Sequence, residues 1–388
     1  MNNILQLDSN NCSGCAVCAA VCPTSAITFG QDERGFYTPF VDESKCVSCG
    51  KCRTVCLKGG ISGRKITDGK LYAARLFDEK VTAQCSSGGI AWDITVLSIK
   101  QGRYVAGCVY DVTENKAKHI VARTLDECEG FKNSKYIQSE TQECFKQLVD
   151  IAKSDPSASF TVFGLPCQIY GIRKAFENLP NDLLCVELFC HGVPTHKLWE
   201  SYLDYLGIEN IKEVNFRHKR DGWHQFGIFV RGENKEHFGT SAPVGRDYFY
   251  KVFFDENVLR DSCIDCKLRK FESLADIRLG DFWGKRYMHD NKGVSAVLTL
   301  TEKGEEVVSL LEGTEIMEKD IPLTDYRYTC FEDKKDVVDI KSREKALELL
   351  ARGKTTDKVV RGVFMTYPLK KKYIRLRLEL KSLLKKRR

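Results

Sequence analysis

Eight of the 18 cysteines lie within the first 56 residues, in two runs of the same spacing. Each run has the pattern C-x2-C-x2-C-x3-C, and this repeat constrains the fold of the chain more than any other feature. Three cysteines of such a run bind one [4Fe–4S] cluster, and the fourth crosses to a second cluster. The spacing therefore predicts one cluster on Cys12, Cys15, Cys18 and Cys56, and another on Cys22, Cys46, Cys49 and Cys52.

This region resembles a bacterial two-cluster ferredoxin. Residues 26–29 and 36–41 have the composition of short strands on either side of a turn at residues 32–35. A structural zinc site is the alternative, but zinc ligands usually come as two C-x2-C pairs and do not repeat a run of four. We expect a two-cluster ferredoxin domain at residues 1–62, followed by a linker rich in Gly and Lys.

The composition bounds the class of protein. An apolar content of 43% and a charged content of 29% allow the 388 residues to form two or three domains without disulfide bonds. The N-terminus lacks the pattern of a secretory signal, and no apolar run reaches the roughly 18 residues of a membrane span. We expect a cytoplasmic protein, in which clustered cysteines bind metal rather than form disulfides. So many oxidisable thiols also suggest an anaerobic organism.

The net charge of +7 comes from one end of the chain. Residues 370–388 contain ten Lys and Arg and one acid, so the rest of the chain is close to neutral and no nucleic-acid-binding face is implied. We expect residues 341–388 to form a helical, basic C-terminal tail. Such a tail can lie on an anionic membrane surface, pack on the body or dock a partner, and the first alternative would make the protein peripheral to the membrane.

From residue 71 the pattern changes to alternating strands and helices, which indicates a mixed α/β body in an α+β protein. We expect this body in two parts, residues 70–175 and 176–340. Strands are expected at 104–110, 119–122, 159–163, 183–189, 211–216, 228–230, 275–279 and 294–300, and helices at 142–153, 169–177, 197–206 and 305–311.

The body carries four further cysteines in suggestive positions. Cys167 and Cys190 each follow an expected strand and precede an expected helix, at the edge where open α/β sheets bind ligands. Cys263 and Cys266 form a separate C-x2-C pair. Four thiolates could hold a third cluster. The spacing alone leaves open a zinc site, or buried structural cysteines beside an unrelated pair.

The other cysteines and the search for nucleotide-binding motifs identify no further site. No G-x-G-x-x-G follows a strand and there is no Walker A sequence, so a Rossmann or P-loop nucleotide site is unsupported. Six cysteines show no ligand spacing and are interpreted as small hydrophobic residues: Cys85, Cys108, Cys128, Cys144, Cys185 and Cys330.

Six sequence phrases, in order along residues 70–300, resemble the family of coenzyme F420 hydrogenase/dehydrogenase beta subunits. An N-terminal ferredoxin domain is a frequent extension in that family, and Gly293–Leu298 continues the match. The phrases are Cys85-Ser-Ser-Gly-Gly89, Asn133-Ser-Lys-Tyr136, Gly164-Leu-Pro-Cys-Gln168, Cys190-His-Gly192, Cys263-Ile-Asp-Cys266 and Gly280-Asp-Phe-Trp-Gly284.

The resemblance implies cofactors for the body. Members of the family bind FAD and typically one [4Fe–4S] cluster there. Some oxidise or reduce the deazaflavin coenzyme F420, whereas plant and cyanobacterial relatives reduce a chlorophyll precursor with ferredoxin. By this resemblance the third cluster would be held by Cys167, Cys190, Cys263 and Cys266.

The resemblance also implies a flavin site. Ser87, Gly88 and Gly89 would let the backbone approach a phosphate or ring, although an ordinary turn is the alternative. Lys135 would place positive charge near the phosphates or the flavin ring, the alternative being a solvated surface lysine. The remaining expected contacts are Tyr136, Pro166, Gln168 and Ser295.

Three histidines lie where they could contact a cluster, a substrate or solvent. His191 follows an expected ligand and could donate to a cluster sulfur or to substrate. His218 and His224 lie in a basic stretch that could meet an anionic substrate or the phosphate tail of coenzyme F420, or could form an exposed loop.

Together these features predict an iron–sulfur flavoprotein oxidoreductase. Electrons would pass between coenzyme F420 or ferredoxin and an organic substrate or redox partner, through FAD and the clusters. The rival interpretation is a non-catalytic electron-transfer subunit of a larger hydrogenase- or dehydrogenase-type complex. The sequence does not identify the catalytic residues, the substrate or the direction of electron flow.

Overall fold

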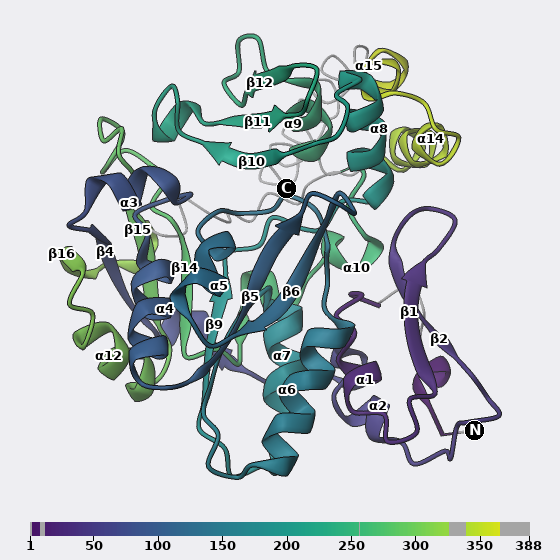
Figure 1. Ribbon diagram of the computed structural model, residues 1–388, viewed down its shortest axis with the longest axis vertical. Helices are drawn as coiled ribbons and strands as arrows, with labels where there is room; N and C mark the ends of the chain where they lie inside the picture. Colours follow the sequence, from purple (N-terminus) through teal and green to yellow (C-terminus); the bar gives the residue numbers. More distant parts are fainter. Residues whose placement is uncertain (1, 8–11, 256, 326–338, 365–388) are drawn as a thin grey trace, which may run out of the picture.

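The computed structural model describes residues 2–7, 12–255, 257–325 and 339–364 (Figure 1). Cys330 and the basic residues 365–388 lie outside the described residues, so the expectations for them stay predictions. Among the helices within those ranges, none is both long and apolar enough to cross a membrane.

The N-terminal module is built around one hairpin and two short helices. Strands β1 (Ile27–Gln31) and β2 (Tyr37–Val41) pair antiparallel, with Ile27 opposite Val41. Helices α1 (Val17–Ala20) and α2 (Lys51–Thr54) each follow a residue in the left-handed conformation. Gly50 supplies that conformation before α2, with a φ of 75° that costs a glycine little. The observed strands match the two expected ones within a few residues.

The body is organised by one nine-stranded mixed sheet. Its central strands β14, β9, β8 and β5 run parallel, so their carboxyl ends meet at one edge. The order across the sheet is β16 (Thr314–Ile321), β4 (Lys70–Leu76), β15 (Ser295–Thr299), β14 (Ile277–Asp281), β9 (Leu183–Leu188), β8 (Phe160–Gly164), β5 (Tyr104–Asp111), β6 (Lys116–Ala122) and β7 (Ser139–Glu140). The mixed α/β body expected from the sequence is confirmed.

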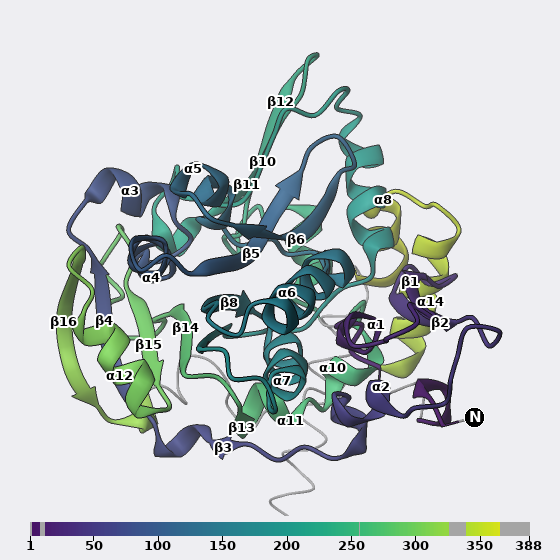
Figure 2. The ribbon, with the colours of Figure 1, turned by 60° about the horizontal axis from the view of Figure 1, so that its bottom comes forward.

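Helices cover both faces of this sheet, because alternate strand residues point to opposite sides. In β9, Leu183 and Cys185 pack with α6 (Gln142–Ser154) and α7 (Pro166–Ala175) on one face. Leu184 and Val186 pack on the other face, with α4 (Ile90–Lys100) and α12 (Glu302–Ser309). Figure 2 shows α6 and α7 beside the N-terminal helix α1.

A second, smaller layer stands above the carboxyl edge of the sheet (Figure 1). It is a three-stranded antiparallel sheet packed on helices around an aromatic core that includes Trp199, Phe216 and Phe249. Its elements are β10 (Glu213–His218), β11 (Gly227–Arg231), β12 (Glu236–Thr240), α8 (His196–Leu206), α9 (Tyr248–Phe253), α14 (Ile340–Ala351), α15 (Thr356–Val359) and a final turn at Val360–Phe364. The described part of the expected tail is therefore helical, and it packs on the body.

Short segments complete the described chain. They connect the larger elements and carry several of the cysteines discussed below. These segments are 3-10 turns at Ile4–Gln6, Leu57–Gly59, Ile66–Asp68, Glu129–Phe131 and Trp223–Gln225, the strand pair β3 (Arg64–Lys65) and β13 (Glu272–Ser273), and the helices α3 (Glu79–Gln84), α5 (Leu125–Cys128), α10 (Asp261–Ile264) and α11 (Lys267–Lys270).

The N-terminal module and the body share one hydrophobic core. Val17 of α1 is completely buried and packs in the same cluster as Phe145 and Ile172 of the body helices. Gly171 of α7 allows this approach, because a side-chain carbon added there would lie 2.7 Å from a methyl group of Val17. The module is thus packed against the body directly rather than linked to it only through the chain.

Candidate functional site

The first predicted set of module cysteines is brought together by the fold. Cys18 lies in α1, and its burial raises the thiol pKa well above the ordinary value. The neighbouring Cys15, Cys12 and Cys56 raise the pKa of Cys18 further, and Cys52 of the second predicted set adds the smallest contribution. Such mutual repulsion requires short distances between the sulfurs, so the four cysteines form one group although Cys56 is far away in sequence.

The second predicted set also forms one group, closer to the surface. Cys22, Cys46, Cys49 and Cys52 line one small cavity of the module. Burial raises the pKa of Cys52, and Cys49 and Cys22 add to the increase. The Asn3 side chain donates to Cys46 Sγ at 3.7 Å, and Cys49 is exposed to solvent.

The four body cysteines come from separate elements. Cys167 is the second residue of α7, directly after β8, and Cys190 follows the end of the neighbouring parallel strand β9. Cys263 lies in α10, and Cys266 caps α11. This places the first two at the carboxyl edge of the sheet, as the sequence predicts.

Electrostatic coupling shows that these four cysteines are neighbours. Burial raises the pKa of Cys190 to about 12, and Cys263 and Cys266 contribute to that increase. Burial also raises the pKa of Cys167 well above its ordinary value, and the thiols that add to the increase are those of Cys15, Cys190, Cys263 and Cys266. The structure thus brings the predicted ligands of the body cluster together.

The coupling between Cys15 and Cys167 links the module to the body. Cys15 belongs to the first module set, and among the neighbouring thiols it has the largest effect on Cys167. Backbone contacts hold the same loop in place, since Thr141 donates to the Cys15 carbonyl at 2.9 Å and Gln138 donates to the Gly14 carbonyl at 3.1 Å. The first module set and the body set are therefore adjacent.

A single metal ion would need a tighter arrangement than these groups have. In the chain segments that the structure describes, no three His, Cys, Asp or Glu side chains lie close enough to hold one ion. A [4Fe–4S] cluster takes its four thiolates at separate corners of a cube, which is a wider arrangement.

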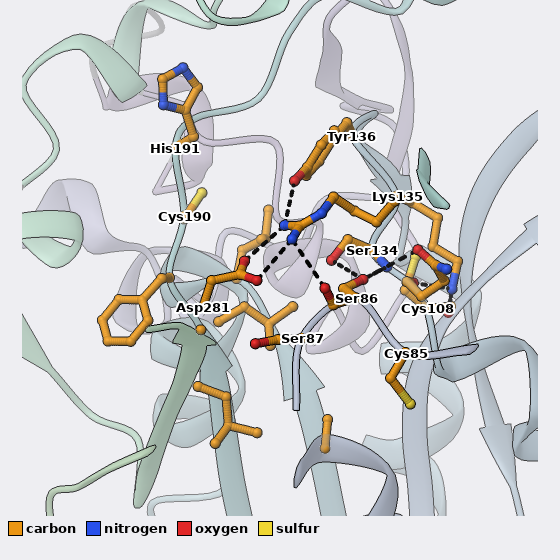
Figure 3. Close-up of a pocket in the computed structure, with 18 of the residues that line it drawn as sticks. Cys85, Ser86, Ser87, Cys108, Ser134, Lys135, Tyr136, Cys190, His191 and Asp281 are labelled. Carbon is orange, nitrogen blue, oxygen red and sulfur yellow. Dashed lines mark hydrogen bonds and ion pairs between the residues drawn. The ribbon is translucent and has the colours of Figure 1, made fainter. Parts of the chain in front are cut away.

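A cavity of about 750 Å³ lies beside the body cysteines. Its walls include the carboxyl ends of β5, β8, β9 and β14, where open α/β sheets bind ligands. The volume falls within the range of about 300–1,000 Å³ that is usual for small-molecule sites. Cys190 and His191 form part of the wall, so one predicted cluster ligand borders the cavity directly (Figure 3).

The expected flavin contacts divide into two groups. Six of the eight line the cavity: Ser87, Gly89, Lys135, Tyr136, Gln168 and Ser295. Gly88 does not reach the wall. A side chain there would meet the carbonyl oxygen of Ala74 at 2.4 Å, and its own N–H donates to Ser295 Oγ at 3.0 Å. Pro166 also lies outside the wall, at the first turn of α7. Gly88 therefore allows close strand packing rather than close approach of a ligand.

Lys135 holds its own loop together. Its ammonium group donates to the carbonyl oxygens of Cys108 at 2.8 Å and Asn133 at 2.7 Å, and to that of Gly130. Burial lowers the pKa of Lys135 to about 8. The alternative of a solvated surface lysine is wrong, because the ammonium group binds three backbone carbonyl oxygens.

An ion pair that the sequence did not reveal lies at the centre of the cavity wall. Arg217 donates two hydrogen bonds of 2.8 Å to the Asp281 carboxylate, and further ones to Tyr136 Oη at 3.0 Å and the Ser86 carbonyl at 3.1 Å (Figure 3). Trp223 donates to the same carboxylate at 2.6 Å. Asp281 is the last residue of β14, and β14 pairs parallel to β9. This pairing places Asp281 at the carboxyl edge of the sheet.

The basic stretch at residues 217–224 is partly buried rather than an exposed loop. Trp223 is fully buried and stacks on Trp283 at 4.8 Å between ring centroids. His224 lines the cavity and donates from Nε2 to the Tyr287 carbonyl at 3.0 Å. His218 packs on Phe229 outside the cavity wall. Both ends of this stretch, Arg217 and His224, therefore line the cavity, whereas His218 between them does not.

The cysteines without ligand spacing are mostly core residues, as expected. Cys128 and Cys185 are fully buried, and Cys144 is nearly so. Cys85 and Cys108 differ from them because both line the cavity. No sequence pattern indicates this position, which depends on the packing of strands that are distant along the chain.

Comparisons with known proteins match both parts of the chain. Residues 11–59 match the 4Fe-4S dicluster domain, and residues 158–322 match the family described as the C terminus of the coenzyme F420 hydrogenase/dehydrogenase beta subunit. The chain is 26% identical, over 80% of its length, to the coenzyme F420-dependent sulfite reductase of Methanocaldococcus jannaschii. It is 24% identical, over 53% of its length, to a subunit of the F(420)H(2) dehydrogenase of Methanosarcina mazei.

These relatives are longer than the region they share with this chain. The matches span 48% of the sulfite reductase and 59% of the dehydrogenase subunit. A chain of the F420-reducing [NiFe] hydrogenase complex of Methanosarcina barkeri aligns with a TM-score of 0.47 and 20% identity, covering 77% of this chain and 92% of that one. The two matching family models confirm the resemblance found in the sequence. This chain thus joins a segment that matches the 4Fe-4S dicluster domain to a body whose residues 158–322 match the family described as the C terminus of the coenzyme F420 hydrogenase/dehydrogenase beta subunit.

Proposed function

We propose that this chain is an iron–sulfur flavoprotein oxidoreductase. It passes electrons between an external carrier, coenzyme F420 or ferredoxin, and a reactant bound in the cavity. The observation that carries the proposal is the continuity of three sites: Cys15 of the module is coupled to Cys167 of the body set, and Cys190 of that set lines the cavity.

The cysteine groups fit the cofactors that the proposal needs. Each group supplies four thiols, the ligands that iron–sulfur clusters use. Burial raises the pKa of the Cys167 and Cys190 thiols, and bound iron would replace the thiol protons and offset much of the thiolate charge. The three sets proposed as ligands are Cys12, Cys15, Cys18 and Cys56; Cys22, Cys46, Cys49 and Cys52; and Cys167, Cys190, Cys263 and Cys266.

The volume of the cavity, about 750 Å³, supports the proposal that FAD binds there. Bound clusters exchange single electrons and bound FAD exchanges one or two, which is the chemistry needed to couple such a carrier to an organic reactant. Ser87, Gly89, Tyr136, Gln168 and Ser295 would orient the ligand. Lys135 and the Arg217–Asp281 pair would act by holding the wall rigid, since their polar groups already bind other protein atoms.

The exposed Cys49 indicates where electrons would enter or leave the protein. The second module set lies closest to solvent, so an external protein carrier would exchange electrons there. The first module set and the body set then lie between that surface and the cavity. The proposed domains follow the same order: 1–62 for the module, 70–175 and 176–340 for the body, and 341–388 for the tail.

The test begins with anaerobic purification and analysis of iron, acid-labile sulfide and flavin. We expect about twelve iron and one FAD per chain, from three clusters of the [4Fe–4S] type. About eight iron without flavin would contradict the assignment of the body while leaving the module assignment intact.

A second candidate function is that of an electron-transfer subunit in a larger complex. One of the relatives is named as a subunit of a dehydrogenase, which favours this alternative. Steady-state assay of the purified chain separates the two, with reduced coenzyme F420 as donor and a viologen as acceptor. Turnover by the chain alone supports the oxidoreductase, and activity only with a co-purifying partner supports the electron-transfer role.

Membrane contact through residues 365–388 is a separate proposal, based on their basic and apolar composition. Sedimentation with anionic liposomes would compare the full chain with a chain ending at residue 364. Equal pelleting of the two forms would remove the idea.

A further inference from the structure

Arg260 lies where the module meets the body. It directly precedes α10, the helix that carries Cys263, and its carbonyl accepts a hydrogen bond of 3.0 Å from the Cys263 N–H. Its guanidinium group reaches into the module and donates to the Cys12 carbonyl at 3.0 Å and the Tyr37 carbonyl at 2.6 Å. A third bond, of 3.3 Å, goes to the Gln138 side-chain oxygen. One side chain thus contacts a predicted ligand loop of the module, and its own backbone holds a predicted ligand of the body.

The charge of Arg260 has no counter-charge in the described part of the chain. The residue is 5% exposed, and all three of its acceptors are neutral oxygens. No Asp or Glu in the described ranges pairs with it. Other buried arginines do have such partners, since Arg217 pairs with Asp281 and Arg278 with Glu187.

A buried cation without an anion is costly, because burial removes it from water and hydrogen bonds to neutral oxygens replace only part of that stabilisation. Arg260 contacts predicted cysteine ligands in both parts, since its guanidinium donates to the Cys12 carbonyl and its backbone carbonyl accepts from the Cys263 N–H. Four thiolates around a [4Fe–4S] core give a site with net negative charge. Clusters bound to the first module set and the body set would therefore supply the missing anions.

We propose that Arg260 is the shared counter-charge of the two clusters that face each other across this junction. The inference rests on the proposed function, because it requires a cluster in each set. Gain of one electron makes a cluster more negative, so a nearby buried cation stabilises the reduced form and raises the reduction potential. Arg260 acts here as a positioning residue for charge, and no bond forms or breaks when the electron moves.

The experiment is an anaerobic redox titration of the full chain followed by electron paramagnetic resonance. In Arg260→Gln, we expect the midpoint potentials of the two flanking clusters to fall, with iron and sulfide content unchanged. Arg260→Lys keeps the charge and should restore most of the lost potential. The cluster on Cys22, Cys46, Cys49 and Cys52 is the internal control, because Arg260 contacts none of its predicted ligands.

A surface arginine provides the matched control. Arg34 pairs with Asp261 of the same α10 helix, but its side chain is 45% exposed, so Arg34→Gln should leave every potential unchanged. Unchanged midpoints in Arg260→Gln with full iron content would overturn the counter-charge role. An equal fall in Arg260→Lys and Arg260→Gln would also overturn it, because charge would then not be the cause.

Gln138→Glu covers the case in which Arg260→Gln does not fold. It places a carboxylate beside the guanidinium, about where Gln138 Oε1 now lies, and should lower the same two midpoints. Unchanged midpoints in this variant would overturn the proposal. A wild-type chain that binds fewer than three clusters would instead contradict the proposed function, so the two failures are distinguishable.

Discussion

The module and the body assemble their cysteines in different ways. The module takes eight cysteines from one continuous segment, residues 12–56, in which tight turns fix the spacing of each run. The body takes four from two neighbouring strand ends and two short helices, spread between residues 167 and 266. Ligands that lie in one local motif can therefore be recognised from their spacing in the sequence. Ligands that come from separate strands and helices can be recognised as one site only when the topology of the sheet is known.

The largest expected effect comes from removing one cysteine of the body. Cys167→Ser should lower the iron content from about twelve to about eight per chain and leave the signals of the module clusters in place. Iron and sulfide analysis, with electron paramagnetic resonance of the reduced protein, measures this. Cys128→Ala, which removes a buried thiol outside every set, should keep the full iron content. Loss of all iron in Cys167→Ser would mean that the body and the module do not bind clusters independently.

The next largest effect concerns the ion pair that braces the cavity in the body. Asp281→Asn leaves Arg217 buried without its carboxylate, which we expect to cost about 3–5 kcal/mol of unfolding free energy. Chemical denaturation measures the change. Glu213→Gln breaks the exposed pair with Arg231 and should cost less than about 1 kcal/mol. Similar costs for the two variants would show that the cavity wall does not depend on the buried pair.

A smaller change in stability is expected from the contact between the module and the body. Gly171→Ala adds a carbon 2.7 Å from a methyl group of Val17, so we expect destabilisation of about 1–3 kcal/mol from overpacking. Differential scanning calorimetry of the wild-type protein and the variant measures this. Val17→Ala in the same chain removes the clashing methyl groups, and the double variant should recover part of the loss. Additive costs would indicate that the two residues do not interact.

The last effect is a difference in acid sensitivity, which is absent at neutral pH. His119 is 7% exposed and donates from Nε2 to the Phe163 carbonyl at 3.1 Å. Burial lowers its pKa to about 4, so the unfolded chain binds a proton more readily than the folded chain between about pH 6.5 and 4. Stability should thus fall as the pH drops through this window, by up to roughly 3 kcal/mol.

His119→Gln should flatten that dependence in thermal melts of the apoprotein taken from pH 7 to pH 4. The module contains no histidine, so it contributes nothing to a pH dependence of this origin. An unchanged slope in the variant would exclude His119 as the source.

Much of the fold was predictable because its elements have regular patterns. Helix α6, for instance, ends one residue beyond the expected range, and both hairpin strands of the module were expected. Helix α4 and strand β4 were not expected. Helix α4 is apolar on several sides and so lacks a clear helical stripe, and β4 gains its place only by pairing with β15 and β16 from the far end of the chain.

The candidate site was likewise predictable only where its residues follow a pattern along the sequence. The cysteine sets followed from spacing and resemblance, and the fold brings each set together. Six of the eight residues expected at a flavin from the resemblance line the cavity. The Arg217–Asp281 pair, the anchoring of Lys135 and the role of Gly88 in strand packing depend on side chains from different strands and loops. Such contacts leave no trace in the spacing of residues along one sequence.

The packing of Val17 against Gly171 has a consequence for kinetics. Because the N-terminal module packs in a core that it shares with the body, it is not free to rotate relative to the body. It therefore cannot carry electrons by moving between an external partner and the body. Electron delivery would then be limited by how often a carrier collides productively with the surface around Cys49. The rate of reduction should accordingly rise in proportion to carrier concentration, without the plateau that a slow domain rotation would impose.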